Sequence, residues 1–177
     1  MLKKIFILIF LLVQGILLYA TIQRPDIFIY NGKEYRLTAI EYPKKYLNIY
    51  SLGIKPIMLT TACWRGYIAT YSISQNNKLI LSQLYTNNGN NINNEIPIIN
   101  GVLPNISTPD RLVNEYKDYR ILDYNNIDLF IEYTGYIIIS LYGNIENIKL
   151  NFINGELINT QEISSQDLQK NYKIINW

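Results

Sequence analysis

Hydrophobic and polar residues alternate in short runs along the chain after residue 20, and turn-forming dipeptides separate these runs. The first two runs, Ile27–Tyr30 and Lys33–Ile40, flank Asn31-Gly32, which is the strongest short signal for a β-hairpin. A two-residue turn pairs the strands so that alternate side chains share one face. The core-facing residues of this hairpin are then expected to be Phe28, Tyr30, Tyr35 and Leu37.

Three further pairs of runs predict hairpins in the same way. They are Tyr67–Gln75 with Lys78–Tyr85 around Asn76-Asn77, Ile127–Tyr133 with Tyr136–Tyr142 around Thr134-Gly135, and Asn147–Ile153 with Glu156–Ile163 around Asn154-Gly155. The run Ile137–Ile139 is apolar on both faces, which predicts a strand covered on both sides. The pattern therefore predicts a mainly β fold, in which antiparallel hairpins form a curled sheet, a sandwich or a partly open barrel, with one or two short helices.

Two segments carry helical signals. Thr108 suits the N-cap of a helix from Pro109 to about Tyr119, because proline is favoured at the first helical position. A second, short helix is expected at Gln166–Tyr172. Residues 43–57 fit either a short strand or one helical turn, and the polar segment Thr86–Asn94 is expected to be a loop.

The first twenty residues have the pattern of a secretory signal. Lys3 and Lys4 precede an apolar run from Ile5 to Leu18, and the small residue Ala20 follows it. The run is at or below the length needed to span a bilayer, so a cleaved signal is favoured over an uncleaved membrane anchor. Residues 21–177 are then one β-rich domain that is periplasmic or secreted or, in the alternative, held at the inner membrane and facing outward.

Composition narrows the chemistry. All 14 acidic residues lie after residue 20, and removal of Lys3 and Lys4 leaves 14 basic residues, so the remaining domain has no net charge. This balance gives no reason to expect nucleic acid as a partner. The chain has no histidine and one cysteine, which removes the commonest general base and any intramolecular disulfide. No metal-ligand spacing or phosphate-binding loop is present, and no cofactor is expected.

Residues 63–70 hold the densest group of unusual side chains. Trp64, Arg65 and Tyr67 are residue types that anchor protein interfaces, so they are the candidate binding residues. The alternative is a bulge at Gly66 at the start of a core strand, with Trp64 packed and Arg65 paired or solvated. The adjacent Cys63 is expected to be a buried, inert thiol, because no histidine can activate it.

The nearest cluster of acids that could perform catalysis is Asp123, Asp128 and Glu132, and Asp128 with Glu132 is the candidate pair. Asp128 and Glu132 fall on one face of the predicted strand Ile127–Tyr133, with Phe130 between them. Paired carboxylates can perform glycoside hydrolysis when they lie within about 10 Å of each other. A solvated strand explains the same spacing.

The two leading motifs support a resemblance. The YNGKEY segment at residues 30–35, with Leu37, and the WRGYIAT segment at residues 64–70 resemble a family of small bacterial proteins that share a YNGKEY hairpin and a WRGYxAT strand. Residues 133–141 and 152–157 resemble the closing strands of that family, and residues 38–60 and the Asn-rich loop do not match it. The resemblance spans roughly residues 27–163 and implies a shared fold with no catalytic residues.

Together these observations favour a non-catalytic exported domain that binds a protein or cell-surface partner. An immunity protein that neutralises a toxin is one specific form of that role. The alternatives are an exported hydrolase that uses Asp128 and Glu132, and a structural protein anchored through residues 1–20.

Overall fold

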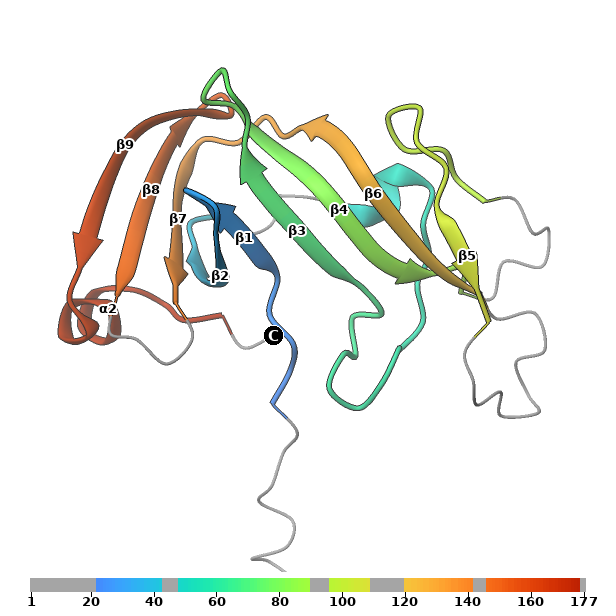
Figure 1. The fold of residues 1–177 in the computed structure, drawn as a ribbon. Helices are drawn as coiled ribbons and strands as arrows, with labels where there is room; N and C mark the ends of the chain where they lie inside the picture. The colour runs from blue at the N-terminus through green and yellow to red at the C-terminus, as the bar shows by residue number, and fades with distance from the viewer. Residues whose placement is uncertain (1–21, 43–47, 90–95, 109–119, 142–145, 176–177) are drawn as a thin grey trace, which may run out of the picture.

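Nine strands form one sheet in the order β5-β6-β4-β3-β1-β2-β7-β8-β9 (Figure 1). The computed structural model describes residues 22–42, 48–89, 96–108, 120–141 and 146–175. The strands are β1 Ile27–Tyr30, β2 Lys33–Ile40, β3 Ile68–Ile73, β4 Leu79–Asn87, β5 Asn105–Ser107, β6 Ile121–Phe130, β7 Gly135–Ser140, β8 Asn147–Ile153 and β9 Glu156–Ile163. The sheet curls without closing, which confirms the predicted mainly β fold.

Irregularities in four strand pairs accompany the curl. The register shifts between Leu37 and Ala39, between Thr70 and Tyr71, between Leu81 and Gln83, and between Asn151 and Phe152. Such bulges bend a strand and increase its twist. We call the strands on either side of β1 the two arms of the sheet: β5, β6, β4 and β3 form one, and β2, β7, β8 and β9 form the other. The two arms consequently approach each other at the top of Figure 1, where the β3–β4 and β8–β9 turns meet.

Hydrogen bonds join these two turns directly. The amide of Leu79 donates to the carbonyl of Gly155, and the amide of Leu157 donates to the carbonyl of Asn77, both at 2.8 Å. Lys78 forms a 3.0 Å ion pair with Glu156 at the same junction. The curl is therefore fixed at one end by backbone contacts between segments almost 80 residues apart.

The concave side of the sheet holds the main core. The predicted hairpin of β1 and β2 is confirmed, with Phe28 opposite Tyr35 and Tyr30 opposite Lys33. Phe28, Tyr35 and Leu37 are buried, and Tyr30 packs against the same cluster. Both arms contribute to this cluster, through Tyr71, Leu81, Leu84, Tyr124, Ile137, Ile139, Leu150 and Phe152 among others.

Strand β7 is covered on both faces, as its sequence predicts. Ile137 and Ile139 face the main core, whereas Ile138 packs in a second cluster with Ile163 and Leu168. Leu168 belongs to helix α2, Ser165–Asn171, which begins where the Ser164 hydroxyl accepts a bond from the Asp167 amide. The predicted C-terminal helix is confirmed within one residue, and it supplies the outer cover of β7.

The predicted hairpin around Thr134-Gly135 is wrong. β6 pairs with β4 and β5, whereas β7 pairs with β2 and β8, so these consecutive strands belong to different arms of the sheet. The connecting segment crosses between the arms and bonds to both. Ile131 donates to the carbonyl of Leu79, and the carbonyl of Tyr133 accepts from the amide of Gly155. A turn-forming dipeptide ends one strand but does not choose the partner of the next.

The expected polar loop at Thr86–Asn94 is wrong at its start. β4 continues to Asn87. Thr86 and Asn87 are buried, and hydrogen bonds from their side chains to backbone groups satisfy them there. Residues 43–57 were expected to form either a short strand or one helical turn. Within them, Ile49–Leu52 is a 3-10 helix that ends at Gly53.

Two expected segments lie entirely outside the described residues, the helix at Pro109–Tyr119 and the N-terminal segment 1–20. Residues 43–47 of the segment 43–57 and residues 90–94 of the expected polar loop also lie outside them. Among the residues that are described, no helix has the length and apolar character needed to cross a membrane.

Candidate functional site

The candidate binding residues lie on a tightly hydrogen-bonded loop, residues 59–67, which we call the Trp64 loop. The amide of Leu59 donates to the carbonyl of Cys63, and Cys63 donates back to Thr60. The N-terminal segment that leads into β1 runs beside this loop. There the amide of Arg24 donates to Ala62, and the side chain of Gln23 bridges the Thr61 carbonyl and the Trp64 amide.

Arg65 is held by a buried carboxylate at the start of β1. Its guanidinium donates to both oxygens of Asp26, at 2.9 and 3.1 Å, and Asp26 also accepts from the amide of Ala69 at 2.9 Å. The carboxylate side chain is 3% exposed. Two-point pairing of this kind fixes the orientation of both side chains. Arg65 thus joins the Trp64 loop to the N-terminal segment.

Burial and charge act in opposite directions on this pair. Burial raises the pKa of Asp26 and outweighs the opposing effects of Arg65 and the Ala69 amide. Burial alone would lower the pKa of Arg65, but the charge of Asp26 more than compensates and raises it. Arg65 also lies 4.6 Å from the ring centre of Tyr67. Arg65 is therefore paired within the protein, and the sequence leaves its side chain open between pairing and solvation.

Gly66 allows the loop to pass close to another segment. Its φ of +76° is in the left-handed region, and a Cβ atom there would lie 2.1 Å from the carbonyl oxygen of Ile57. Thr86 and Asn87 both donate to the Gly66 carbonyl. The side chain of Asn87 also bonds to the backbone of Ile57. The positive φ and the close approach of the Ile57 backbone are what require glycine at position 66.

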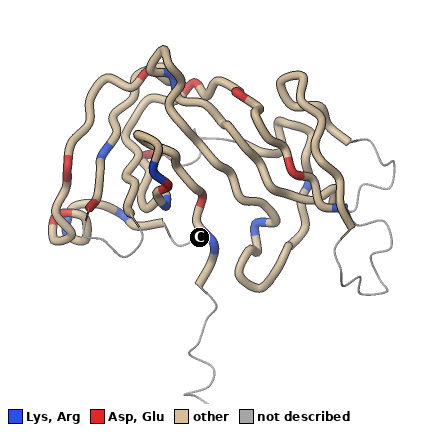
Figure 2. Tube along the Cα trace, in the orientation of Figure 1, with Lys and Arg blue, Asp and Glu red and all other residues tan. Residues whose placement is uncertain are grey.

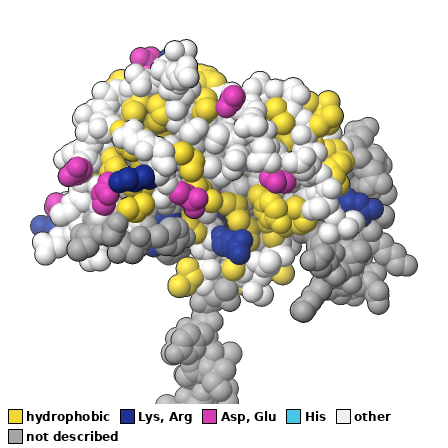
Figure 3. All heavy atoms as spheres, viewed as in Figure 1, with side chains coloured by type: hydrophobic (Ala, Val, Ile, Leu, Met, Phe, Trp, Pro, Cys, Tyr) yellow, Lys and Arg dark blue, Asp and Glu magenta, His cyan; other side chains and the backbone are white. Residues whose placement is uncertain are grey.

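Trp64 points out of this rigid framework. Its side chain is 69% exposed, which contradicts the packed Trp64 of the structural alternative. Two other exposed apolar side chains come from segments bonded to the loop or adjoining it, Ile22 at 89% and Met58 at 54%. Figure 3 shows separate hydrophobic side chains among polar atoms at the base of the domain, where the described N-terminal residues begin. We call Ile22, Met58 and Trp64 the Trp64 surface.

Cys63 is a buried thiol, as expected. Burial raises its pKa, against the weaker opposing effect of Arg65, and its Sγ lies 3.3 Å from the carbonyl oxygen of Tyr67. A protonated, inaccessible thiol is a poor nucleophile.

The strand that carries the acid pair is shorter than predicted. β6 ends at Phe130, so Glu132 lies beyond the strand that contains Asp128. Asp128 has a φ of +49°, and the side chains of Asp128, Phe130 and Glu132 are all exposed. Asn and Asp tolerate such backbone angles better than other residues with side chains. Among the described residues, no group of three His, Cys, Asp or Glu side chains could hold a metal ion.

Asp26 is the site residue that sequence analysis missed. It precedes a short strand and follows Pro25, which gives it the pattern of an ordinary turn residue. Its partner lies 39 residues further along the chain. The one available signal was a lone acidic residue directly before an apolar run.

Comparisons of the chain with protein-family models, with curated proteins and with solved structures found no match. The resemblance noted in the sequence stays a prediction.

Proposed function

We propose that this chain is a non-catalytic exported domain that binds a protein partner through the Trp64 surface. The observation that carries the proposal is a tryptophan that is 69% exposed on a loop fixed by a buried ion pair. Tryptophan is among the residues that contribute most to protein interfaces. A loop that is already ordered loses little conformational entropy on binding.

The surroundings of Trp64 favour a protein over other partners. Ile22 and Met58 add apolar area, and Arg65, the nearest cation in sequence, is paired with Asp26. Figure 2 shows Lys and Arg interspersed with Asp and Glu along the described trace. A nucleic-acid partner would instead call for a continuous basic patch.

Photo-crosslinking in the cells that make the protein tests the proposal. A benzophenone amino acid is placed at Trp64 and, in a matched control, at Tyr85, which is an exposed aromatic residue on β4. We expect illumination to crosslink the protein to another protein from position 64, which gives a discrete adduct of higher mass. No such adduct is expected from position 85. Adducts of equal yield from both positions, or no protein adduct from position 64, contradict the proposal.

A substitution separates contact from folding. Trp64→Ala is expected to abolish an adduct formed from a photo-reactive residue at the neighbouring Met58, while the yield of folded protein stays unchanged because the side chain is exposed. Retention of the Met58 adduct in this variant would place the contact elsewhere than at Trp64.

A further inference from the structure

A hollow of about 410 Å³ lies where β1 and β3 diverge, apart from the Trp64 surface. The two strands are parallel and pair only as far as Ile29 and Ser72. Beyond that point β1 turns at Asn31-Gly32 into β2, while β3 continues to Ile73. The curl of the sheet brings Leu157 of β9 to the opposite wall. The hollow is therefore a product of the topology.

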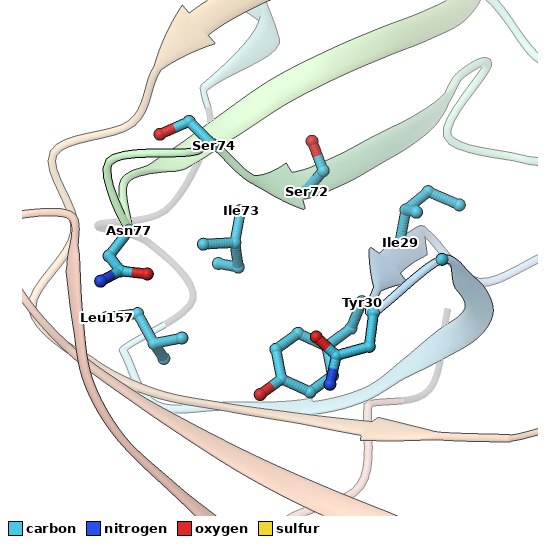
Figure 4. A pocket seen from close by; sticks show the side chains of 9 residues that line it. Ile29, Tyr30, Ser72, Ile73, Ser74, Asn77 and Leu157 are labelled. Carbon is cyan, nitrogen blue, oxygen red and sulfur yellow. The ribbon is translucent and has the colours of Figure 1, made fainter.

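The floor of the hollow is apolar. In Figure 4 the side chains of Ile73 and Leu157 and the ring of Tyr30 surround one space, and they come from β3, β9 and β1. All three side chains pack against the main core. The ring of Tyr30 stands edge-on to Tyr35, with the ring centres 6.5 Å apart. This contact and the core behind it hold the tyrosine ring in place.

The rim of the hollow is polar and uncharged. It carries hydroxyl and amide groups from Tyr30, Asn31, Ser72, Ser74 and Asn77, and none of the nine lining residues is acidic or basic. The hydroxyls of Tyr30 and Ser72 and the side-chain amide of Asn77 have no hydrogen-bond partner among the described residues. Ser74 accepts a bond from the Lys78 amide and keeps its own proton to donate.

We propose that this hollow binds a neutral saccharide. A pyranose ring has an apolar C–H face and a circle of hydroxyls, which match the Tyr30 ring with its aliphatic neighbours and the uncharged rim. A charged ligand would be desolvated there without a counter-charge. An extended peptide needs a groove open at both ends, whereas turns at Asn31-Gly32 and at Asn77 bound this hollow. The volume lies within the usual range for small-ligand sites.

Binding is tested on the full-length protein in a detergent that has no sugar headgroup. The probes are cellobiose, the trisaccharide of N-acetylglucosamine, trialanine as a neutral peptide and glucuronic acid as an anion, followed by saturation-transfer NMR and calorimetry. We expect saturable binding of at least one neutral saccharide. Retention on insoluble chitin or cellulose distinguishes recognition of a polymer end from recognition of a free sugar. Saturable binding of trialanine or glucuronic acid alone, or of no probe, overturns the proposal.

Variants place the binding at this hollow. Tyr30→Ala is expected to weaken saccharide binding by about tenfold, since an aromatic contact is worth about that factor. Asn77→Gly removes an amide but keeps the left-handed backbone, where φ is +57°, and is expected to weaken binding about threefold. The matched control Tyr85→Ala removes an exposed tyrosine outside the hollow.

Trp64→Ala separates this proposal from the proposed function, because it is expected to leave saccharide binding unchanged. If saccharide affinity is the same in wild type, Tyr30→Ala and Asn77→Gly, the assignment of the hollow is wrong whether or not the protein partner exists.

Discussion

The guanidinium of Arg65 donates to both carboxylate oxygens of Asp26, across 39 residues of chain, and this pair joins the start of β1 to the loop that precedes β3. β1 and β3 are the parallel neighbours at the centre of the sheet. The pair therefore stabilises the middle of the sheet, where β1 lies beside β3. It also fixes the loop that exposes Trp64.

Removal of Asp26 is expected to destabilise the fold strongly. Asp26→Ala removes the carboxylate that accepts from the Arg65 guanidinium and from the Ala69 amide, which is expected to cost about 3 kcal/mol of unfolding free energy. Urea denaturation followed by circular dichroism measures this loss.

The second ion pair provides the matched control. Lys78 and Glu156 are 40% and 56% exposed, so Lys78→Ala is expected to cost less than about 1 kcal/mol. Equal losses in the two variants would show that burial of the Arg65–Asp26 pair does not contribute to stability.

Substitution of Gly66 is expected to be more harmful than that of another glycine with the same backbone angle. Gly66→Ala places a Cβ against the Ile57 carbonyl in addition to the strain of a positive φ, for a loss of more than about 2 kcal/mol. Gly101 has a φ of +80° with open space around it, so Gly101→Ala is expected to cost about 1 kcal/mol. Thermal unfolding of both proteins measures the difference, and similar melting temperatures would refute the contact argument.

Trp64→Ala is expected to change the unfolding free energy by less than about 0.5 kcal/mol, because the side chain is mostly in solvent. Tyr71→Ala, which removes a fully buried ring, is expected to cost at least about 3 kcal/mol. Denaturant unfolding of the two variants compares an exposed ring with a buried one. A large loss for Trp64→Ala would make the tryptophan structural and weaken the case for a binding role.

The thiol of Cys63 is expected to be inert in the native protein. Burial excludes reagent and raises the pKa of the thiol, so its thiolate is scarce at neutral pH. An aromatic disulfide reagent should therefore react slowly with the native protein in buffer. In urea it should react with one thiol per chain. A native reaction as fast as that of free cysteine would contradict the buried position.

Alkaline pH is expected to destabilise the fold between about pH 10 and pH 12. Burial raises the pKa of Tyr124 to about 12 and also raises that of Tyr133, whereas an unfolded tyrosine titrates near 10. In this window the folded state holds protons that the unfolded state has lost, so stability present below pH 10 falls as the pH rises.

Urea unfolding at several alkaline pH values measures this slope. Tyr124→Phe removes one of the tyrosines whose pKa is raised by burial, and its stability should fall less steeply with pH than that of the wild type. An unchanged slope would exclude Tyr124 as a source of the effect.

The local elements were predictable where a few neighbouring residues determine them. Asn31-Gly32 and Asn154-Gly155 form hairpin turns at the predicted places, since asparagine and glycine tolerate the positive φ angles that such turns require. The apolar run Ile137–Ile139 identified a strand covered on both sides, because each of its side chains needs apolar surroundings.

The candidate site could be predicted only in part, because its geometry is not determined by neighbouring residues alone. Trp64 and Arg65 are conspicuous in the sequence, but nothing near them indicates that one is exposed and the other buried. That outcome depends on Asp26, whose carboxylate is brought to Arg65 by the pairing of β1 with β3.

The sequence by itself determined the strand content and three of the hairpins, through turn chemistry and alternation that act over a few residues. It also indicated a buried Cys63, because a free cysteine behaves as a small hydrophobic residue. Only the tertiary structure decided that β6 and β7 separate into different arms, that Asp26 meets Arg65, and that Tyr30 and Leu157 line one hollow. These relationships depend on which strands pair and how far the sheet curls. Pairing and curl are set by packing of the whole core, and no local segment encodes them.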